Sequence, residues 1–329
     1  MTTSILRATW HSPSATICDI IDFRYGRQDP IISILAAKRE AMQTNEVRRR
    51  IFQIERLATV PHVVWGIVES LNDDRTTAAD LEQLIYGDPA LASKMLSLAN
   101  SAYYGLPRNV TTISRAVNVI GIQELQMLAA GVGLADSQEF DKPPADYRVE
   151  DLWIHSAAVS FAAGELAEAS GHPLPDEVRT AGLLHDLGKF VLVTHLTDCL
   201  DQIMALIDEG LSYRDAECQT GLDHTTLGYW LAKRWGLPEN HQLVIRDHHH
   251  PRPDKPAYIT TCLVYLANEL VNAVQKRPYP RPTNGMNVEI MAVTNITENI
   301  LEQVQERTKQ KMAALADRFS TLSKGDDPR

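Results

Sequence analysis

The chain has 329 residues, of which 44% are hydrophobic and 22% are charged, so its composition is that of an ordinary globular protein that can bury a sizeable core. The 17 glycines and 17 prolines are too few for a collagenous or low-complexity chain. The formal net charge of −10 repels phosphate backbones and anionic lipid, which argues against nucleic acids and membranes as partners.

The expected location is the cytoplasm. The first residues, MTTSILRATWHSPS, lack the cationic start and long apolar run of a signal peptide. The most apolar stretch, residues 116–135, contains polar side chains such as Asn118 and Glu124, which favour a buried helix over a membrane span. The cysteines are scattered and form no CxxC pair, which is typical of reduced thiols rather than of a disulfide or zinc framework: Cys18, Cys199, Cys218 and Cys262.

Helix start and stop signals recur along the chain. Pro61 is expected to begin a helix, and residues 77–80 resemble a capping box. Asp88 followed by Pro89 predicts the start of the next helix, which should end near Gly105.

The remainder of the chain repeats these signals. Further helices are predicted over residues 112–121, 149–171, 175–187, 197–210 and 223–236, and from Ser212, Pro238 and Pro256. No convincing alternating strand or hairpin interrupts them, so the expected fold class is all-α.

Two long proline-containing connections, residues 136–147 and 277–284, suggest domain boundaries. We therefore predict four parts: an N-terminal extension, two helical lobes, and a C-terminal helix with a tail. They span residues 1–55, 56–145, 146–283 and 284–329. The basic run 48–50 in the extension is interpreted as a solvated helix face, with a docking patch for an acidic partner as the less favoured alternative.

The segment GLLHDLGK, residues 182–189, places His185 and Asp186 side by side among leucines. An imidazole and a carboxylate together suit a divalent ion such as iron, manganese, zinc or magnesium. Gly188 is expected to let the backbone turn sharply after them, and the ammonium of Lys189 could then hold a phosphate. A buried His–Asp hydrogen-bonded pair that closes a helix end explains the same residues equally well.

Other histidines each have an ordinary explanation when taken singly. His155 lies within a predicted helix, where Asp151, four residues earlier, could ligate the same ion or orient the imidazole. His224 lies at a helix start, and residues 248–250 are three histidines at a helix end. Because metal sites in helical proteins are assembled from facing helices, the set as a whole favours a metal centre.

Residues 57–273 resemble an HDOD protein, a member of the regulatory branch of the HD metal-dependent phosphohydrolase superfamily. The resemblance rests on DPALASKMLSLANSAYYGLP (88–107), ISRAVNVIG (113–121), WIHS (153–156), GLLHDLGK (182–189), His224 with Gly228, WGLP (235–238) and the pair His248–His249. It implies an all-α fold of two helical lobes, residues 56–145 and 146–283, the second of HD-domain type. Such domains are associated with bacterial signal transduction, and many have lost their metal ligands.

The resemblance also implies a ligand set that this chain largely retains. The matching positions are His155, His185 and Asp186 for a first ion and His224, His248 and His249 for a second, with Asn268 in place of the final aspartate. Asparagine brings no charge, which should weaken one site. The Gly-Tyr-Pro signature of the cyclic di-GMP phosphodiesterase branch is absent after His249, so that activity is disfavoured.

Two functions follow as expectations. The first is a regulatory protein that binds one or two divalent ions, with iron or manganese favoured over zinc or magnesium, and whose partner is an unidentified signalling protein or a small phosphorylated ligand. The alternative is a metal-dependent phosphohydrolase or phosphodiesterase acting through a metal-bound hydroxide, with Asp186 and Lys189 in catalytic roles. A two-iron centre with redox chemistry ranks third, and the sequence does not indicate an oligomeric state.

Overall fold

The computed structural model covers the chain and describes residues 44–54, 57, 76–122, 124–125, 149–275 and 284–323, with no side chains for 284–287 and 318–323. The chain divides into two compact units, Met1–Glu46 and Val47–Arg329. In the first unit only residues 44–46, the start of a short helical segment, are described. All that follows concerns the second unit.

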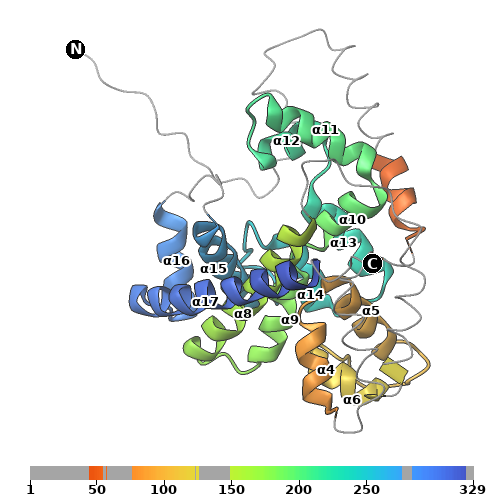
Figure 1. Cartoon of the computed structure of the whole chain (residues 1–329), viewed down its shortest axis with the longest axis vertical. Coiled ribbons are helices and arrows are strands. Elements are labelled where there is room, and N and C mark those ends of the chain that lie inside the picture. Colours follow the sequence, from red (N-terminus) through yellow and green to blue (C-terminus); the bar gives the residue numbers. More distant parts are fainter. Residues whose placement is uncertain are drawn as a thin grey trace. The chain divides into compact units, whose positions relative to one another are not determined.

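The described part of the second unit is helical and contains no strand, which confirms the all-α prediction (Figure 1). Its labelled helices are α4 (Ala78–Ile85), α5 (Pro89–Ala99), α6 (Ile113–Ile120), α8 (Val149–Ser170), α9 (Pro175–Leu184), α10 (Leu187–His195), α11 (Thr197–Asp208), α12 (Tyr213–Thr220), α13 (His224–Arg234), α14 (Glu239–Asp247), α15 (Tyr258–Val274), α16 (Asn284–Thr294) and α17 (Glu298–Ser323). The helix expected from Pro61 and the boundaries predicted near residues 55, 145 and 283 lie outside the described residues.

Local capping explains where several helices begin. Thr77 and Asp80 form the reciprocal capping box at the start of α4. The carboxylate of Asp88 accepts hydrogen bonds from two backbone amides of the first turn of α5. That helix ends at Ala99 rather than near Gly105, because the side chain of Asn100 hydrogen-bonds both the N–H and the carbonyl of Val110 and so turns the chain away.

The predictions that a helix spans residues 175–187 and that the backbone turns sharply at Gly188 are wrong. The chain breaks earlier, at His185 and Asp186 between α9 and α10, and Gly188 lies inside α10. A Cβ atom at Gly188 would lie 1.9 Å from the carbonyl oxygen of His224 and 2.7 Å from the amide nitrogen of Gly228. The glycine is therefore needed for the close approach of α10 and α13, not for a turn.

Among the described residues, buried apolar side chains form two clusters. One joins α4, α5 and α6 with α10 to α13, and Phe190 is its largest fully buried side chain. The other joins α8, α9, α14 and α15 with the C-terminal helices. Helices α8, α9 and α14 contribute to both clusters, so these three helices lie where the two clusters meet. We call this region the seam.

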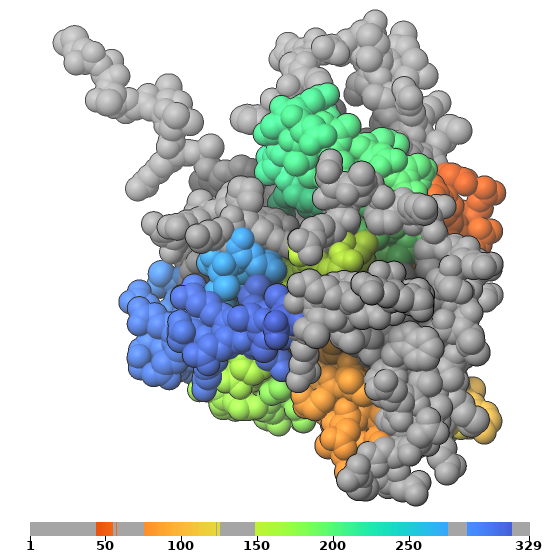
Figure 2. Space-filling model, in the orientation of Figure 1, coloured from red at the N-terminus to blue at the C-terminus, as the bar shows by residue number. Residues whose placement is uncertain are grey.

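The C-terminal helix α17 covers α8 along the surface of the second cluster, where the blue helix lies beside the yellow-green one (Figures 1 and 2). Arg307 of α17 forms an ion pair with Glu165 of α8 at 3.0 Å. Val304 of α17 is fully buried, so the helix packs through an apolar stripe as well.

The basic run 48–50 contacts the chain itself. Arg50 donates two hydrogen bonds of 2.9 Å to the carboxylate of Asp198 and one of 2.7 Å to the carbonyl of His195. The guanidinium of Arg48 lies 5.7 Å from the ring of Trp230. Arg48 and Arg49 are exposed, as a solvated face predicts, whereas Arg50 is partly buried by its ion pair.

Among the described residues, no single helix has the length and apolarity to cross a membrane. One pair, residues 175–195 with 197–208, meets the length and composition criterion only together, and it bends by 105°.

Candidate metal centre

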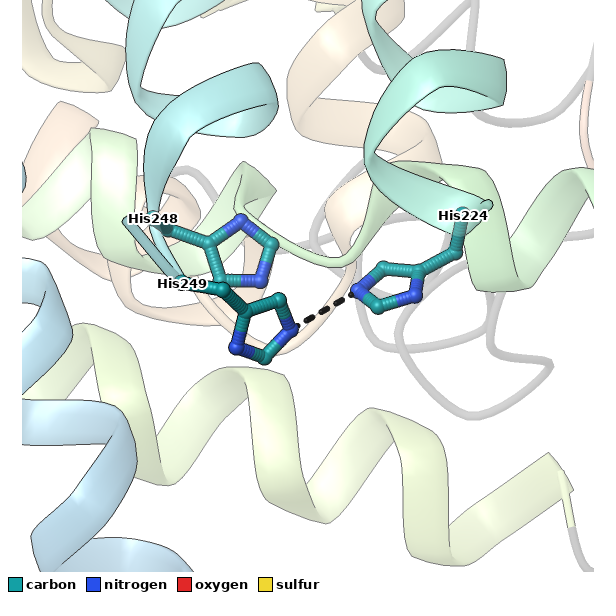
Figure 3. A group of neighbouring side chains, drawn as sticks. All are labelled: His224, His248 and His249. Carbon is teal, nitrogen blue, oxygen red and sulfur yellow. Dashed lines mark hydrogen bonds between the residues drawn. The ribbon is translucent and has the colours of Figure 1, made fainter. Parts of the chain in front are cut away.

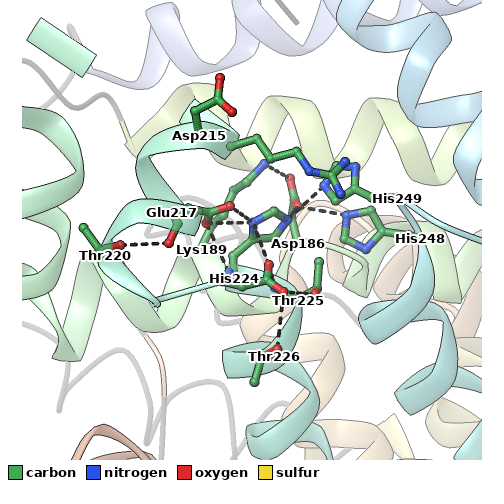
Figure 4. A network of polar contacts seen from close by, with 12 residues as sticks. Asp186, Lys189, Asp215, Glu217, Thr220, His224, Thr225, Thr226, His248 and His249 are labelled. Atoms are coloured by element: carbon green, nitrogen blue, oxygen red, sulfur yellow. Dashed lines mark hydrogen bonds and ion pairs between the residues drawn. The ribbon is translucent and has the colours of Figure 1, made fainter. Parts of the chain in front are cut away.

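Six of the seven predicted ligands come from four places along the seam between the two apolar clusters. His155 lies on α8, and His185 and Asp186 occupy the break between α9 and α10. His224 is the first residue of α13, and residues 248–249 follow directly after α14. Segments up to 94 residues apart in the sequence thus meet in one cluster. Figure 4 shows Asp186 with His224, His248 and His249.

The carboxylate of Asp186 lies at the centre of this cluster. Its Oδ2 atom is 3.3 Å from Nε2 of His185 and 3.5 Å from Nε2 of His155. Its Oδ1 atom is 3.3 Å from Nε2 of His224 and 3.6 Å from Nε2 of His248. One carboxylate therefore faces imidazoles on both of its oxygen atoms, which is the position of a bridging ligand.

In the part of the chain that the structure describes, three groups of possible ligands each have their ligand atoms within 4.8 Å of one another: one joins His224 with Glu217 and Asp223, and the other two contain only predicted ligands. Of these two, the first, here called the His155 group, consists of His155, His185 and Asp186. The second, the His249 group, consists of His224, His248 and His249 (Figure 3). In the second group Nε2 of His249 and Nε2 of His224 are 3.2 Å apart.

Backbone carbonyls orient two of the imidazoles. Nδ1 of His185 lies 2.8 Å from the carbonyl oxygen of Gly182, and Nδ1 of His248 lies 3.0 Å from that of Ile245. A hydrogen bond at Nδ1 fixes the tautomer and leaves Nε2 as the ligating atom. Both Nε2 atoms point toward Asp186, as metal ligation requires.

Two orienting residues were not predicted from the sequence. Nδ1 of His155 lies 3.1 Å from the side-chain oxygen of Gln275, and Nδ1 of His224 lies 2.8 Å from both oxygens of Glu217. No helical spacing relates either pair, since the first is 120 residues apart and the second is separated by the loop between α12 and α13. The role suggested for Asp151 stays a prediction.

Several buried polar atoms in the cluster make no hydrogen bond: Nε2 of His185, Oδ1 of Asp186 and Nε2 of His248. All three residues are fully buried. Orphaned polar groups in a protein interior cost free energy and are rare in native structures. A hydrogen bond between His185 and Asp186 leaves Nε2 of His248 without a partner, whereas a cation among these atoms can bind all three.

The charge states suit ligation. Burial raises the pKa of Asp186, but the charges of His185 and Lys189 outweigh burial and hold this pKa well below its usual range. Burial and the neighbouring histidines hold the pKa values of His248 and His249 well below the usual value, so both imidazoles are neutral. Burial lowers the pKa of His224, but the charge of Glu217 and the hydrogen bonds to Asp186 and Glu217 together outweigh burial and raise this pKa to about 10, so a bound ion must displace a proton there.

The donor set consists of imidazole nitrogens and carboxylate oxygen without sulfur. Such a set suits borderline and hard divalent ions, including iron, manganese and zinc. The residues present therefore fit a divalent metal ion.

Asn268 is buried on α15, and its side-chain oxygen accepts a hydrogen bond of 3.1 Å from Asn272. Gln275, which contacts His155, lies two turns further along the same helical face. Direct ligation by Asn268 stays a prediction. The nearby carboxylate of Asp247 is engaged by Arg246 at 2.7 and 2.8 Å.

Comparison with known proteins extends these observations. The model of the HDOD domain matches residues 57–251. An uncharacterized protein of Treponema pallidum (strain Nichols) is 27% identical over 225 residues, which is 65% of this chain and 42% of the relative. The match thus spans less than half the length of that relative.

Solved structures share the fold. An HDOD domain protein of unknown function from Geobacter sulfurreducens is 26% identical with a TM-score of 0.50, over 82% of this chain and 96% of that one. The MmoQ response regulator of Methylococcus capsulatus is 20% identical with a TM-score of 0.62, over 76% and 98%. A virulence factor of Campylobacter jejuni is 17% identical with a TM-score of 0.64, over 82% and 98%. At these identities the last two structures show the fold alone.

Proposed function

Because the chain belongs to the HDOD domain family, within the HD superfamily, we propose that it is a bacterial regulatory protein whose HD-like lobe binds one or two divalent metal ions. The observation that supports this most is the convergence of orphaned, fully buried Nε2 and Oδ1 atoms from His185, His248 and Asp186. Each such atom costs about 1–3 kcal/mol when left unpaired, and a bound cation removes that cost.

The ligand assignment follows the two groups. His155 and His185 would hold one ion, and His224, His248 and His249 would hold the other, with Asp186 as a ligand available to both. Asn268 completes the first ion's set through its carbonyl oxygen. The bound ion supplies positive charge and Lewis acidity in the seam between the two apolar clusters.

In this proposal metal occupancy is the regulatory signal. Helices α8, α9 and α14 contribute to both apolar clusters and also bring the ligands, so filling or emptying the site changes how the clusters are held together. The partner that responds is a signalling protein or a small phosphorylated ligand.

The first test is elemental analysis of the full chain purified without chelators or added metal, beside His185→Ala and Asp186→Ala. We expect iron, manganese or zinc at one to two equivalents in the wild type, and loss of metal in both variants. His172→Ala is the matched control, because that imidazole hydrogen-bonds locally to the amide of Leu174 at a helix end. A folded wild type that stays metal-free after anaerobic reconstitution contradicts the proposal.

A specific contact favours phosphoester hydrolysis as the second candidate function. The ammonium of Lys189 is buried, lies 2.7 Å from Oδ2 of Asp186, and is 5.5 Å from the centre of the Tyr213 ring. A cation held beside the ligand cluster is placed to bind a phosphoryl oxygen and to stabilise the charge that develops on it.

This second function is tested with a generic substrate, bis(p-nitrophenyl) phosphate, and the metal-loaded full chain. Hydrolysis that disappears in Lys189→Met, while the bound metal is retained, supports the enzyme. If the protein retains its metal but hydrolyses no phosphomonoester, phosphodiester or nucleotide, only the proposed regulatory function remains.

A further inference from the structure

Glu217 is a buried carboxylate that touches a predicted ligand without being one itself. Its side chain is 2% exposed, and both of its oxygens lie 2.8 Å from Nδ1 of His224. Its Oε1 atom also accepts a hydrogen bond of 3.1 Å from the backbone amide of His224 (Figure 4). The carboxylate therefore fixes both the ring and the first backbone amide of α13.

The position of Glu217 is itself well defined. Its carbonyl oxygen accepts hydrogen bonds from the amides of Gly221 and Leu222 and from the hydroxyl of Thr220. Gly221 adopts a left-handed conformation (φ 68°), which ends α12 and starts the short loop to α13. This turn places the carboxylate of Glu217, on α12, next to His224, the first residue of α13.

The contact determines which nitrogen of His224 is available. With Nδ1–H donating to Glu217, Nε2 remains to face Oδ1 of Asp186 at 3.3 Å and Nε2 of His249 at 3.2 Å. His185 and His248, in contrast, donate from Nδ1 to neutral backbone carbonyls. A carboxylate partner makes an imidazole a better electron donor and adds a negative charge close to the ion.

The charges around the two ligand groups are unequal. The oxygen of Asp186 that faces the His155 group, Oδ2, is 2.7 Å from the ammonium of Lys189, which opposes a second cation at that oxygen. The oxygen that faces the His249 group, Oδ1, has the carboxylate of Glu217 behind His224 instead. The charge of Lys189 also acts on the imidazoles of the His249 group, so the preference for that group rests on the carboxylate of Glu217 beside His224.

From these contacts we infer that Glu217 is a positioning residue for His224 and makes the His249 group the tighter of the two metal sites. This inference rests on the proposed metal binding and adds the order in which the ions are bound. The His249 group fills first, and the His155 group, with Lys189 at its shared oxygen, fills second.

The test is isothermal titration calorimetry of the metal-free full chain with Mn²⁺. In the wild type we expect a tight and a weak binding event. His249→Ala removes the tight event, and His155→Ala removes the weak one. If only one ion binds, it is lost in His249→Ala and retained in His155→Ala.

Glu217→Gln keeps the shape of the side chain and removes its charge. We expect it to weaken the tight event by about 10- to 100-fold and to leave the weak one unchanged. Glu217→Asp keeps the charge and should retain more affinity than Glu217→Gln. The matched control is Glu209→Gln, an exposed substitution at the end of α11, which should change neither event.

A double-variant comparison separates positioning from a general structural role. In the His249→Ala background, where the tight event is already gone, Glu217→Gln should not alter the remaining event. The inference is overturned if Glu217→Gln weakens both binding events equally or changes neither. It is also overturned if the tight event is lost in His155→Ala. In each of these cases the proposed metal binding still stands. A wild type that binds no Mn²⁺ overturns the inference and the proposed function together. Far-UV circular dichroism of each variant identifies any that fails to fold.

Discussion

Replacement of Gly188 by alanine tests whether α10 and α13 cross through direct backbone contact. The added Cβ would lie 1.9 Å from the carbonyl oxygen of His224, where ordinary van der Waals contacts are 3.4–4 Å. The neighbouring atoms belong to the backbone of α13, so no side chain can rotate away, and the two helices must separate by more than an ångström.

Two opposing terms decide the sign of the effect. Alanine is about 1 kcal/mol more favourable than glycine inside a helix. Overpacking of a tight contact costs about 1–3 kcal/mol and occasionally more, and the shortness of this contact places it at the upper end. We therefore expect Gly188→Ala to lower the free energy of unfolding by about 2 kcal/mol.

Urea unfolding followed by far-UV circular dichroism measures this loss. Ala205→Gly, an exposed substitution within α11, gives the helix-propensity term in the same protein, with an expected loss of about 1 kcal/mol. The same movement displaces His224 from Asp186, so Gly188→Ala should also weaken metal binding. A Gly188→Ala protein that is as stable as the wild type, or more stable, refutes the close crossing of the two helices.

Three further predictions concern other contacts. Asp88→Ala should lower the free energy of unfolding by about 1–2 kcal/mol, because it removes the acceptor of two amides at the start of α5, whereas Asp88→Asn should recover most of the loss in the same urea assay. The hydrogen bonds and charge of Arg50 lower the pKa of Asp198 below its usual value of 3.8, so this pair stabilises the folded state above that pH and loses its contribution as the pH falls through the lowered pKa. The pair is exposed, so Asp198→Asn should cost under about 1 kcal/mol at pH 7, and a difference from wild type that does not shrink in acid would contradict the ion-pair explanation. Burial raises the pKa of Cys199 to about 11, so iodoacetamide at pH 8 should modify the exposed Cys218 before Cys199. Peptide mass spectrometry measures the order, and labelling of Cys199 as early as Cys218 would disprove its burial.

Short-range sequence signals were sufficient for most of the fold. Thr77, Asp88 and Ser212 each begin a helix where predicted, because a capping side chain acts on amides only two or three residues away. The motif around His185 and Asp186 and the later histidine pair also indicated the candidate ligands, since these residue types are unusual among apolar helical neighbours.

The sequence by itself therefore determined the helical class, the family resemblance and the set of candidate ligands. Only the tertiary structure decided how these residues are used. Gly188 permits a helix crossing instead of a turn, Gln275 reaches His155 across 120 residues, and Glu217 reaches His224 across a loop. Such contacts depend on how whole helices pack rather than on any local spacing, and for that reason no pattern in the chain revealed them.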